Sequence, residues 1–240
     1  MVFDFLTKRS IMTRNTLRGM TDVHAHLLPG VDDGVQSVED AVRILERLHE
    51  AGISRVFCTP HVMADLYGNR KALLQERFDE FVSGLPPVGI EIFLAAEYML
   101  DNGFLSHLKD GLLTFDGRHV LVETSYMSAP PAFEDLLYEI DLSGYCPVLA
   151  HPERYLYMGW KQYEMLWRRG CLFQLNLLSL GGYYGKEVCR KAEWLLEMGY
   201  YHFVGTDIHK GSQANFFSSV KTNRKTDRLL RKLVENNEMK

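Results

Sequence analysis

Short apolar runs alternate with amphipathic stretches along most of the chain. Runs that are apolar throughout and rich in Val, Ile, Leu, Phe or Tyr predict strands buried on both faces. Seven such runs occur, at about 21–26, 53–58, 90–96, 119–123, 147–150, 172–176 and 202–206. Alternation of strands with helices is typical of a parallel sheet, either open or closed into a barrel. Seven strands in so short a chain favour a compact barrel.

The amphipathic stretches predict the helices between these strands. The clearest is SVEDAVRILERLHEAG, in which Ser37 is suited to cap the N-terminus and Gly52 to end the helix. Its apolar residues recur on one face: Val38, Val42, Leu45 and Leu48. Further helices are expected at about 70–83, 132–143, 161–169 and 184–198, and a charged helix from about residue 218.

Composition narrows the class of protein. The chain has 240 residues, 46% hydrophobic and 24% charged, and a net charge of −4, so it reads as globular and gives no reason to expect nucleic-acid binding. The cysteines are far apart and form no CxxC pair, which indicates thiols of a reduced compartment: Cys58, Cys146, Cys171 and Cys189. No apolar run reaches the length of a membrane span. We therefore expect a cytoplasmic protein, with a basic leader over 1–20 and a single domain over 21–240.

Polar residues gather where the predicted strands end. Six of the seven strands deliver a His, Asp or Glu at the carboxyl end: His24, His26, Asp32 and Asp33, then His61, Glu97, Glu123, His151, and finally Asp207 and His209. Barrels and open α/β sheets build their sites on that face. One acid at a strand end, such as Glu123, is more often a structural hydrogen-bond partner. Six convergent positions indicate a site.

The residue types point to transition-metal ions. Imidazoles together with carboxylates suit zinc, manganese, iron or cobalt, whereas calcium and magnesium prefer oxygen ligands alone. Strand alternation directs His24 and His26 to the same side, where both can hold one ion. Nine candidate ligands, with one of the two adjacent aspartates counted, are too many for one metal but suffice for two or three with carboxylate bridging. The remaining histidines are expected to be structural.

Other reaction classes lack their motifs. The chain has no GxSxG elbow, no Walker A loop, no HExxH, and no cysteine followed by arginine six residues later. Covalent catalysis by Ser or Cys therefore has no support, and metal-activated water does.

The chain resembles the polymerase-and-histidinol-phosphatase (PHP) superfamily of metal-dependent phosphoesterases in five motifs that follow one another in the same order: TDVHAH, CTPH, Glu97, AHPERY and TDIH. The chain is most similar to the capsule and exopolysaccharide branch of this superfamily, the bacterial manganese-dependent protein-tyrosine phosphatases. The features shared with that branch are HLLPGVDDG, a Glu at the fourth strand and HPERY. The resemblance covers about residues 20–215. It implies a distorted seven-stranded (β/α) barrel with a metal cluster on the carboxyl face.

The resemblance also implies the ligand sets of two or three divalent ions, manganese first, with iron, cobalt or zinc as alternatives. One ion would be held by His24, His26, Glu97 and Asp207, a second by Glu97, Glu123 and His151, and a third by Asp33, His61 and His209. Alignment alone favours Asp33 over Asp32. Arg154 matches the family's phosphate-clamping arginine. A second arginine beyond DxH is missing, so Lys210 or Arg224 is the candidate replacement.

The implied substrate is phosphotyrosine on a protein, with an autophosphorylating tyrosine kinase of polysaccharide export as the implied partner. A small phosphorylated metabolite such as histidinol phosphate is the alternative substrate, and a non-catalytic module is a third hypothesis. Six tyrosines in or near the carboxyl-face loops could flank a phosphotyrosine ring, and none is assigned a role: Tyr67, Tyr98, Tyr126, Tyr155, Tyr183 and Tyr184. The oligomeric state is left open.

Overall fold

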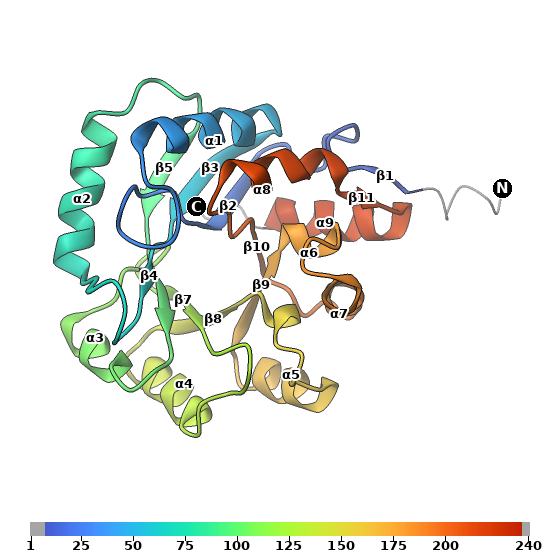
Figure 1. The fold of residues 1–240 in the computed structure, drawn as a ribbon. Coiled ribbons are helices and arrows are strands. Elements are labelled where there is room, and N and C mark those ends of the chain that lie inside the picture. The colour runs from blue at the N-terminus through green and yellow to red at the C-terminus, as the bar shows by residue number, and fades with distance from the viewer. Residues whose placement is uncertain (1–7, 237–240) are drawn as a thin grey trace.

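A computed structural model describes residues 8–236, which form a curled parallel sheet surrounded by helices (Figure 1). Three strands pair in the order β2-β3-β5: β2 (Met20–Ala25), β3 (Ile53–Cys58) and β5 (Glu91–Leu94). Six more pair in the order β10-β9-β8-β7-β6-β4: β4 (His61–Val62), β6 (Glu97–Met99), β7 (His119–Glu123), β8 (Cys146–Ala150), β9 (Leu172–Asn176) and β10 (Phe203–Gly205). Every pair within these two sheets is parallel. The expected α/β fold with a curled parallel sheet is confirmed.

Backbone hydrogen bonds join the two sheets near the carboxyl ends of their strands. On one side, the amide of His26 donates to the carbonyl of Ile208 at 2.9 Å, which ties the loop after β10 to the end of β2. On the other, the chain itself passes from β3 into β4 and from β5 into β6, and the amide of Glu97 donates to the carbonyl of Pro60 at 3.1 Å where β6 meets the start of β4. These bonds draw the strand ends toward one another, so the side chains that follow the strands converge.

Helices cover the outside of the sheet (Figure 1). They are α1 (Val38–Glu50), α2 (Lys71–Ser83), α3 (Phe104–Asp110), α4 (Phe133–Leu142), α5 (Trp160–Arg168), α6 (Leu177–Leu180), α7 (Lys186–Glu197), α8 (Gly211–Phe216) and α9 (Arg224–Asn236). Ser37 caps α1 as expected, because its hydroxyl accepts from the amide of Asp40 at 3.1 Å. The chain leaves this helix through Gly52, whose φ of +96° favours glycine. The predicted final helix begins later, at Arg224.

Two sequence-based expectations differ from the structure. The single strand expected at 90–96 is two strands. β5 pairs with β3 as far as Leu94, and β6, which begins at Glu97, pairs with β4. Glu97 therefore begins β6 instead of ending a strand. Short helices α3, α6 and α8 were not expected either; each has seven residues or fewer, too short for a helical period to stand out.

The segment expected as a leader packs onto the domain from residue 9 onward. β1 (Arg9–Ser10) pairs antiparallel with β11 (Lys221–Thr222), and Ile11 and Leu17 are fully buried. The hydroxyl of Thr16 donates to Asp227 of α9 at 2.5 Å. The start of the expected leader, residues 1–7, lies outside the described residues. Within 8–236, none of the helices has the length and apolar character needed to cross a membrane.

Candidate metal centre

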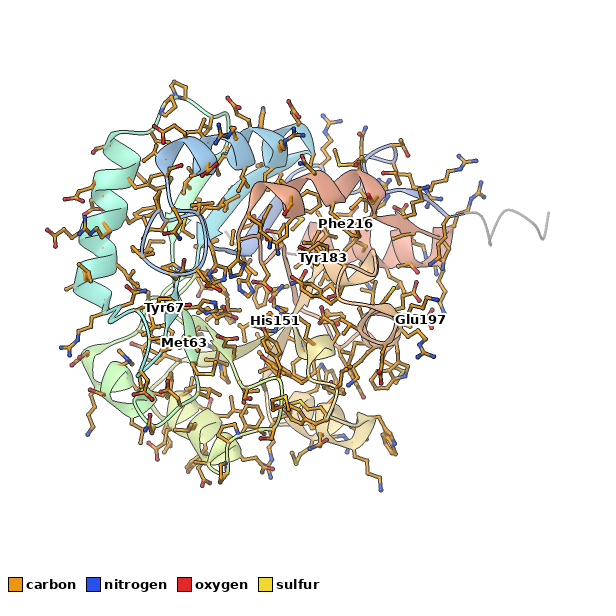
Figure 2. All side chains as sticks on the ribbon, in the orientation of Figure 1. Met63, Tyr67, His151, Tyr183, Glu197 and Phe216 are labelled. Carbon is orange, nitrogen blue, oxygen red and sulfur yellow. The ribbon has the colours of Figure 1, made fainter. Side chains whose placement is uncertain are left out.

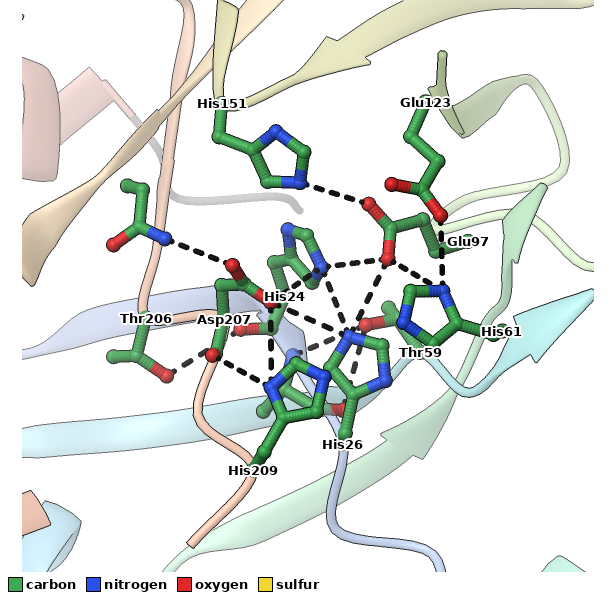
Figure 3. Close-up of polar contacts among 12 residues, drawn as sticks. His24, His26, Thr59, His61, Glu97, Glu123, His151, Thr206, Asp207 and His209 are labelled. Carbon is green, nitrogen blue, oxygen red and sulfur yellow. Dashed lines mark hydrogen bonds and ion pairs between the residues drawn. The ribbon is translucent and has the colours of Figure 1, made fainter. Parts of the chain in front are cut away.

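Nine His, Asp and Glu side chains meet at the carboxyl ends of the strands. All of them except Asp33 are labelled in Figure 3. Their ligand atoms fall into four overlapping groups, and the atoms within each group lie within 4.8 Å of one another. The groups are His26, Asp33, His61 and His209; His24, His26 and Glu97; His24, His151 and Asp207; and His61, Glu97 and Glu123. All nine residues predicted as ligands belong to these groups. The groups differ in part from the implied sets, since His61 also faces Glu97 and Glu123.

The two histidines of β2 are held with Nε2 toward the centre. Nδ1 of His24 donates to Oε1 of Gln174 at 2.9 Å, and Nδ1 of His26 donates to Oδ2 of Asp32 at 2.8 Å. The two Nε2 atoms lie 3.1 Å apart. An imidazole whose Nδ1 carries the proton presents a free lone pair on Nε2, which is how a metal-binding histidine is oriented.

Glu97 lies in the middle of the cluster and is completely buried. Its Oε2 is 3.1 Å from Nε2 of His24 and 3.1 Å from Nδ1 of His61, and its Oε1 is 3.2 Å from Nε2 of His151. Neither oxygen accepts a hydrogen bond from the described residues. Buried carboxylates nearly always have such partners, so a carboxylate ringed by imidazole nitrogens without them fits a bridging metal ligand.

The two adjacent aspartates of the first loop have different positions. Asp32 is buried, and its Oδ2 also accepts from the amide of His61 at 3.0 Å. The side chain of Asp33 is 58% exposed, with Oδ1 3.5 Å from Nε2 of His61 and 3.6 Å from Nε2 of His209. Asp32 therefore orients the loop and His26, whereas Asp33 presents its carboxylate to the cluster.

Burial disfavours the charged form of each group, and the opposite charges within the cluster counteract it: the neighbouring carboxylates raise the pKa of His24 and His61, and that of His26 to about 9. Burial raises the pKa of Glu97, but His24 and His61 lower it further, so the net pKa is well below its usual range. Burial likewise opposes ionisation of Asp207, yet the charges of His24 and His151 bring its pKa down to about 2. Burial and the neighbouring His26 lower the pKa of His209 to about 4. Both carboxylates are thus anionic and His209 is neutral at pH 7.

Two of the candidate ligands have backbone conformations that side-chain-bearing residues rarely adopt. His151 has φ +33° and Asp207 has φ +52°, in the left-handed region that costs about 1–2 kcal/mol without glycine. The amide of Asp207 donates to the carbonyl of His24 at 2.6 Å. Such conformations cluster at functional sites, where the surrounding structure enforces them.

A cavity of about 550 Å³ opens over the cluster. Its walls include Met63 and Tyr67, which lie to one side of His151 in Figure 2. Of the lysines and arginines in the described chain, only Arg154 lines this cavity. Lys210 is exposed at the start of α8 outside the cavity lining, and Arg224 does not line it either. The structure therefore brings one predicted phosphate ligand into the cavity lining and leaves both replacement candidates out of it.

Sequence reasoning missed the contribution of β9, the one predicted strand without a candidate ligand. Gln174 holds His24 and also accepts from the amide of His151 at 3.2 Å. The side-chain nitrogen Nδ2 of Asn176 donates to Oδ2 of Asp207 at 3.0 Å. Both residues are fully buried. The signal was the pattern LFQLN, since an amide side chain inside an otherwise apolar strand needs a buried partner.

A cluster of imidazoles and carboxylates over the carboxyl face of a parallel α/β sheet places this chain among proteins built to bind metal ions. Residues 20–233 match the family described as "Capsular polysaccharide synthesis, CpsB/CapC", and the chain belongs to that family. The resemblance found in the sequence motifs is confirmed.

Individual relatives agree with this assignment. The chain is 30% identical over 210 residues to the tyrosine-protein phosphatase YwqE of Bacillus subtilis (strain 168), covering 82% of this chain and 80% of the relative. It is 27% identical to the tyrosine-protein phosphatase CpsB of Streptococcus pneumoniae over 201 residues, covering 79% and 83%. It is also similar to a crystal structure from work on YwqE and CpsB, described as unique metal-dependent tyrosine phosphatases, with a TM-score of 0.76, 26% identity and coverage of 92% and 96%.

Proposed function

We propose that this protein hydrolyses phosphotyrosine on proteins with the help of bound divalent ions, manganese first among them. The observation that carries the proposal is Glu97, a buried carboxylate whose oxygens face imidazole nitrogens and accept no hydrogen bond from the described residues. The curated relatives YwqE and CpsB are tyrosine-protein phosphatases, which supports the same substrate class. Neither these relatives nor the crystal structure supports histidinol phosphate as the substrate.

The nine side chains are proposed to hold two or three ions. His24, His26, Glu97 and Asp207 form one set, Glu97, Glu123 and His151 a second, and Asp33, His61 and His209 a third. The pairing of β10 with β2 through their following loops supports a distorted seven-stranded barrel as the frame of this cluster. When bound, the ions would supply an activated water and neutralise charge on the phosphoryl group.

The chain's own residues bind and orient the substrate. Arg154 lines the cavity beside Asp207 and is suited to hold two phosphoryl oxygens through its planar fork of donors. Leu66, Tyr67 and Met127 present exposed apolar surface at the cavity wall, which suits the aryl group of phosphotyrosine. A phenolate leaving group has a pKa of about 10, so its departure needs less help from a general acid than that of an alkyl alcohol.

We further propose that the phosphotyrosine belongs to a tyrosine kinase that controls capsular or exopolysaccharide synthesis. The family description, capsular polysaccharide synthesis, supports this partner. The cluster lies below an open cavity with exposed apolar walls, which a protein-borne phosphotyrosine can enter.

The test is hydrolysis of a phosphotyrosine peptide by protein that is treated with EDTA and then supplied with manganese. We expect activity to vanish with the chelator and to return with the metal. Glu97→Gln should abolish turnover, while Glu91→Gln, on an exposed side chain of β5, should not. Activity that persists in EDTA, or turnover of histidinol phosphate well above that of the peptide, would contradict the proposal.

A further inference from the structure

Two tyrosine rings enclose the guanidinium group of Arg154. Its central carbon lies 4.3 Å from the ring centroid of Tyr126 and 4.2 Å from that of Tyr184. Tyr126 comes from the loop after β7 and Tyr184 from the segment between α6 and α7. Segments from different parts of the chain thus cover the guanidinium group, and each contact is within the range of a cation–π interaction.

The enclosure leaves the edge of the guanidinium group available. Nη1 of Arg154 donates to Oδ2 of Asp207 at 2.7 Å, the only hydrogen bond the described residues give this group. A guanidinium group carries five N–H donors in one plane, so most of them have no partner here. The side chain is 20% exposed and lines the cavity. Its free donors can therefore meet an anion only along the edge of the plane.

From this geometry we propose that Tyr126 and Tyr184 are positioning residues that fix Arg154 as a preformed fork for the phosphoryl group, a role that rests on the proposed function. An unrestrained arginine loses rotamer freedom when it binds an anion, and a side chain held in place beforehand avoids much of that loss. Because Arg154 is the one arginine or lysine of the described chain that lines the cavity, no second basic side chain there replaces its hydrogen bonds if the fork is loose.

The two tyrosines differ in one respect that the experiment can use. The hydroxyl of Tyr184 lies 3.4 Å from Oδ2 of Asp207 and 3.2 Å from Nδ2 of Asn176, so this residue also contacts the support of the metal centre. Tyr126 is 44% exposed, and its ring contacts Arg154 and lies with its centroid 5.7 Å from that of His151, but its hydroxyl makes no hydrogen bond to Asp207 in the described chain. Tyr126 therefore separates the effect of stacking from the effect on Asp207.

The experiment measures binding of inorganic phosphate to the metal-loaded protein by calorimetry, together with kcat and KM for a phosphotyrosine peptide. Tyr126→Leu and Tyr184→Leu should each weaken phosphate binding roughly 5- to 30-fold, the size of one desolvated cation–π contact. Tyr126→Phe should restore nearly full affinity, because the ring remains. Tyr138→Leu, which removes an exposed ring from α4, is the control and should bind phosphate like the parent protein.

Metal content is measured for each variant, so that a damaged metal centre is not mistaken for a loose arginine. Leu variants that keep their metal and bind phosphate like the parent protein would overturn the inference, as would a Phe variant no better than the Leu variant. If the parent protein binds phosphate in a ring-dependent way but fails to hydrolyse phosphotyrosine, the proposed function fails while this inference stands.

Discussion

Gly205, the last residue of β10, lies where the sheet packs closely against the candidate metal centre. A Cβ added there would lie 2.5 Å from Cβ of His24 and 3.0 Å from the backbone nitrogen of His24. Carbon atoms in contact prefer about 3.5–4.0 Å, so Gly205→Ala forces β2 and β10 apart, or displaces His24, by about 1 Å. Its backbone does not require glycine, since its φ is not positive. The damage is thus steric.

The expected magnitude follows from this overlap. Overpacking of a well-packed core costs about 1–3 kcal/mol, which in a chain of this size lowers the melting temperature by about 2–4 °C per kcal/mol. Metal–ligand distances tolerate only about 0.2 Å, so displacement of His24 by about 1 Å should also reduce metal content and turnover severely.

Differential scanning calorimetry and metal analysis of the purified variant test both effects. Gly211→Ala is the matched control, because an added Cβ at Gly211 meets no atom within 4 Å. We expect the control to keep its melting temperature and metal. If Gly205→Ala has the same melting temperature as the control and binds as much metal, the close packing of β10 against His24 does not constrain the centre.

Three further predictions concern residues around the centre. Asp207→Gly and Asp207→Ala should both be inactive, but the Gly variant should be more stable by about 1 kcal/mol in denaturant titrations, because φ at this position is +52°; equal stability would argue against backbone strain. Asp32→Asn should lower metal affinity by about 10- to 100-fold and should also lower the melting temperature of EDTA-treated protein. Asp33→Asn should lower metal affinity alone, since Asp33 is exposed. The reverse pattern would exchange the roles of the two aspartates. Lys191→Met should lower the free energy of unfolding by about 1–3 kcal/mol, because Nζ of Lys191 donates to the carbonyl of Tyr155 at 2.9 Å in the loop after Arg154. Thermal melting and limited proteolysis of that loop measure the loss of stability. An unchanged melting curve would contradict the prediction.

Much of the sheet could be predicted because buried parallel strands are apolar without interruption. β3, β7 and β9 have the predicted bounds. The break between β5 and β6 was hidden, because Ala95 and Ala96 continue the apolar run while the backbone changes its partner from β3 to β4. A change of pairing partner is a tertiary event and leaves no mark in local hydrophobicity.

The candidate site was predictable for the same topological reason. Side chains that follow parallel strands converge whatever the loops between them do, so most of the candidate ligands could be chosen before their geometry was known. Glu97 is an exception because it begins β6, and Asp33 was preferred to Asp32 by alignment alone. The supporting residues were not predictable. Gln174 and Asn176 act through partners distant in sequence, and the stacking of two tyrosines on Arg154 depends on where two loops come to rest.

The two carboxylate oxygens of Asp207 have different partners. Oδ1 lies 3.4 Å from Nε2 of His24, on the metal side, and Oδ2 accepts from Arg154 and Asn176, on the anion side. Substitutions on the two sides therefore share a partner, and residues that share a partner do not contribute additively. For protein engineering the two sides therefore form one unit, because a design that transfers only one of them leaves Asp207 without half of its partners.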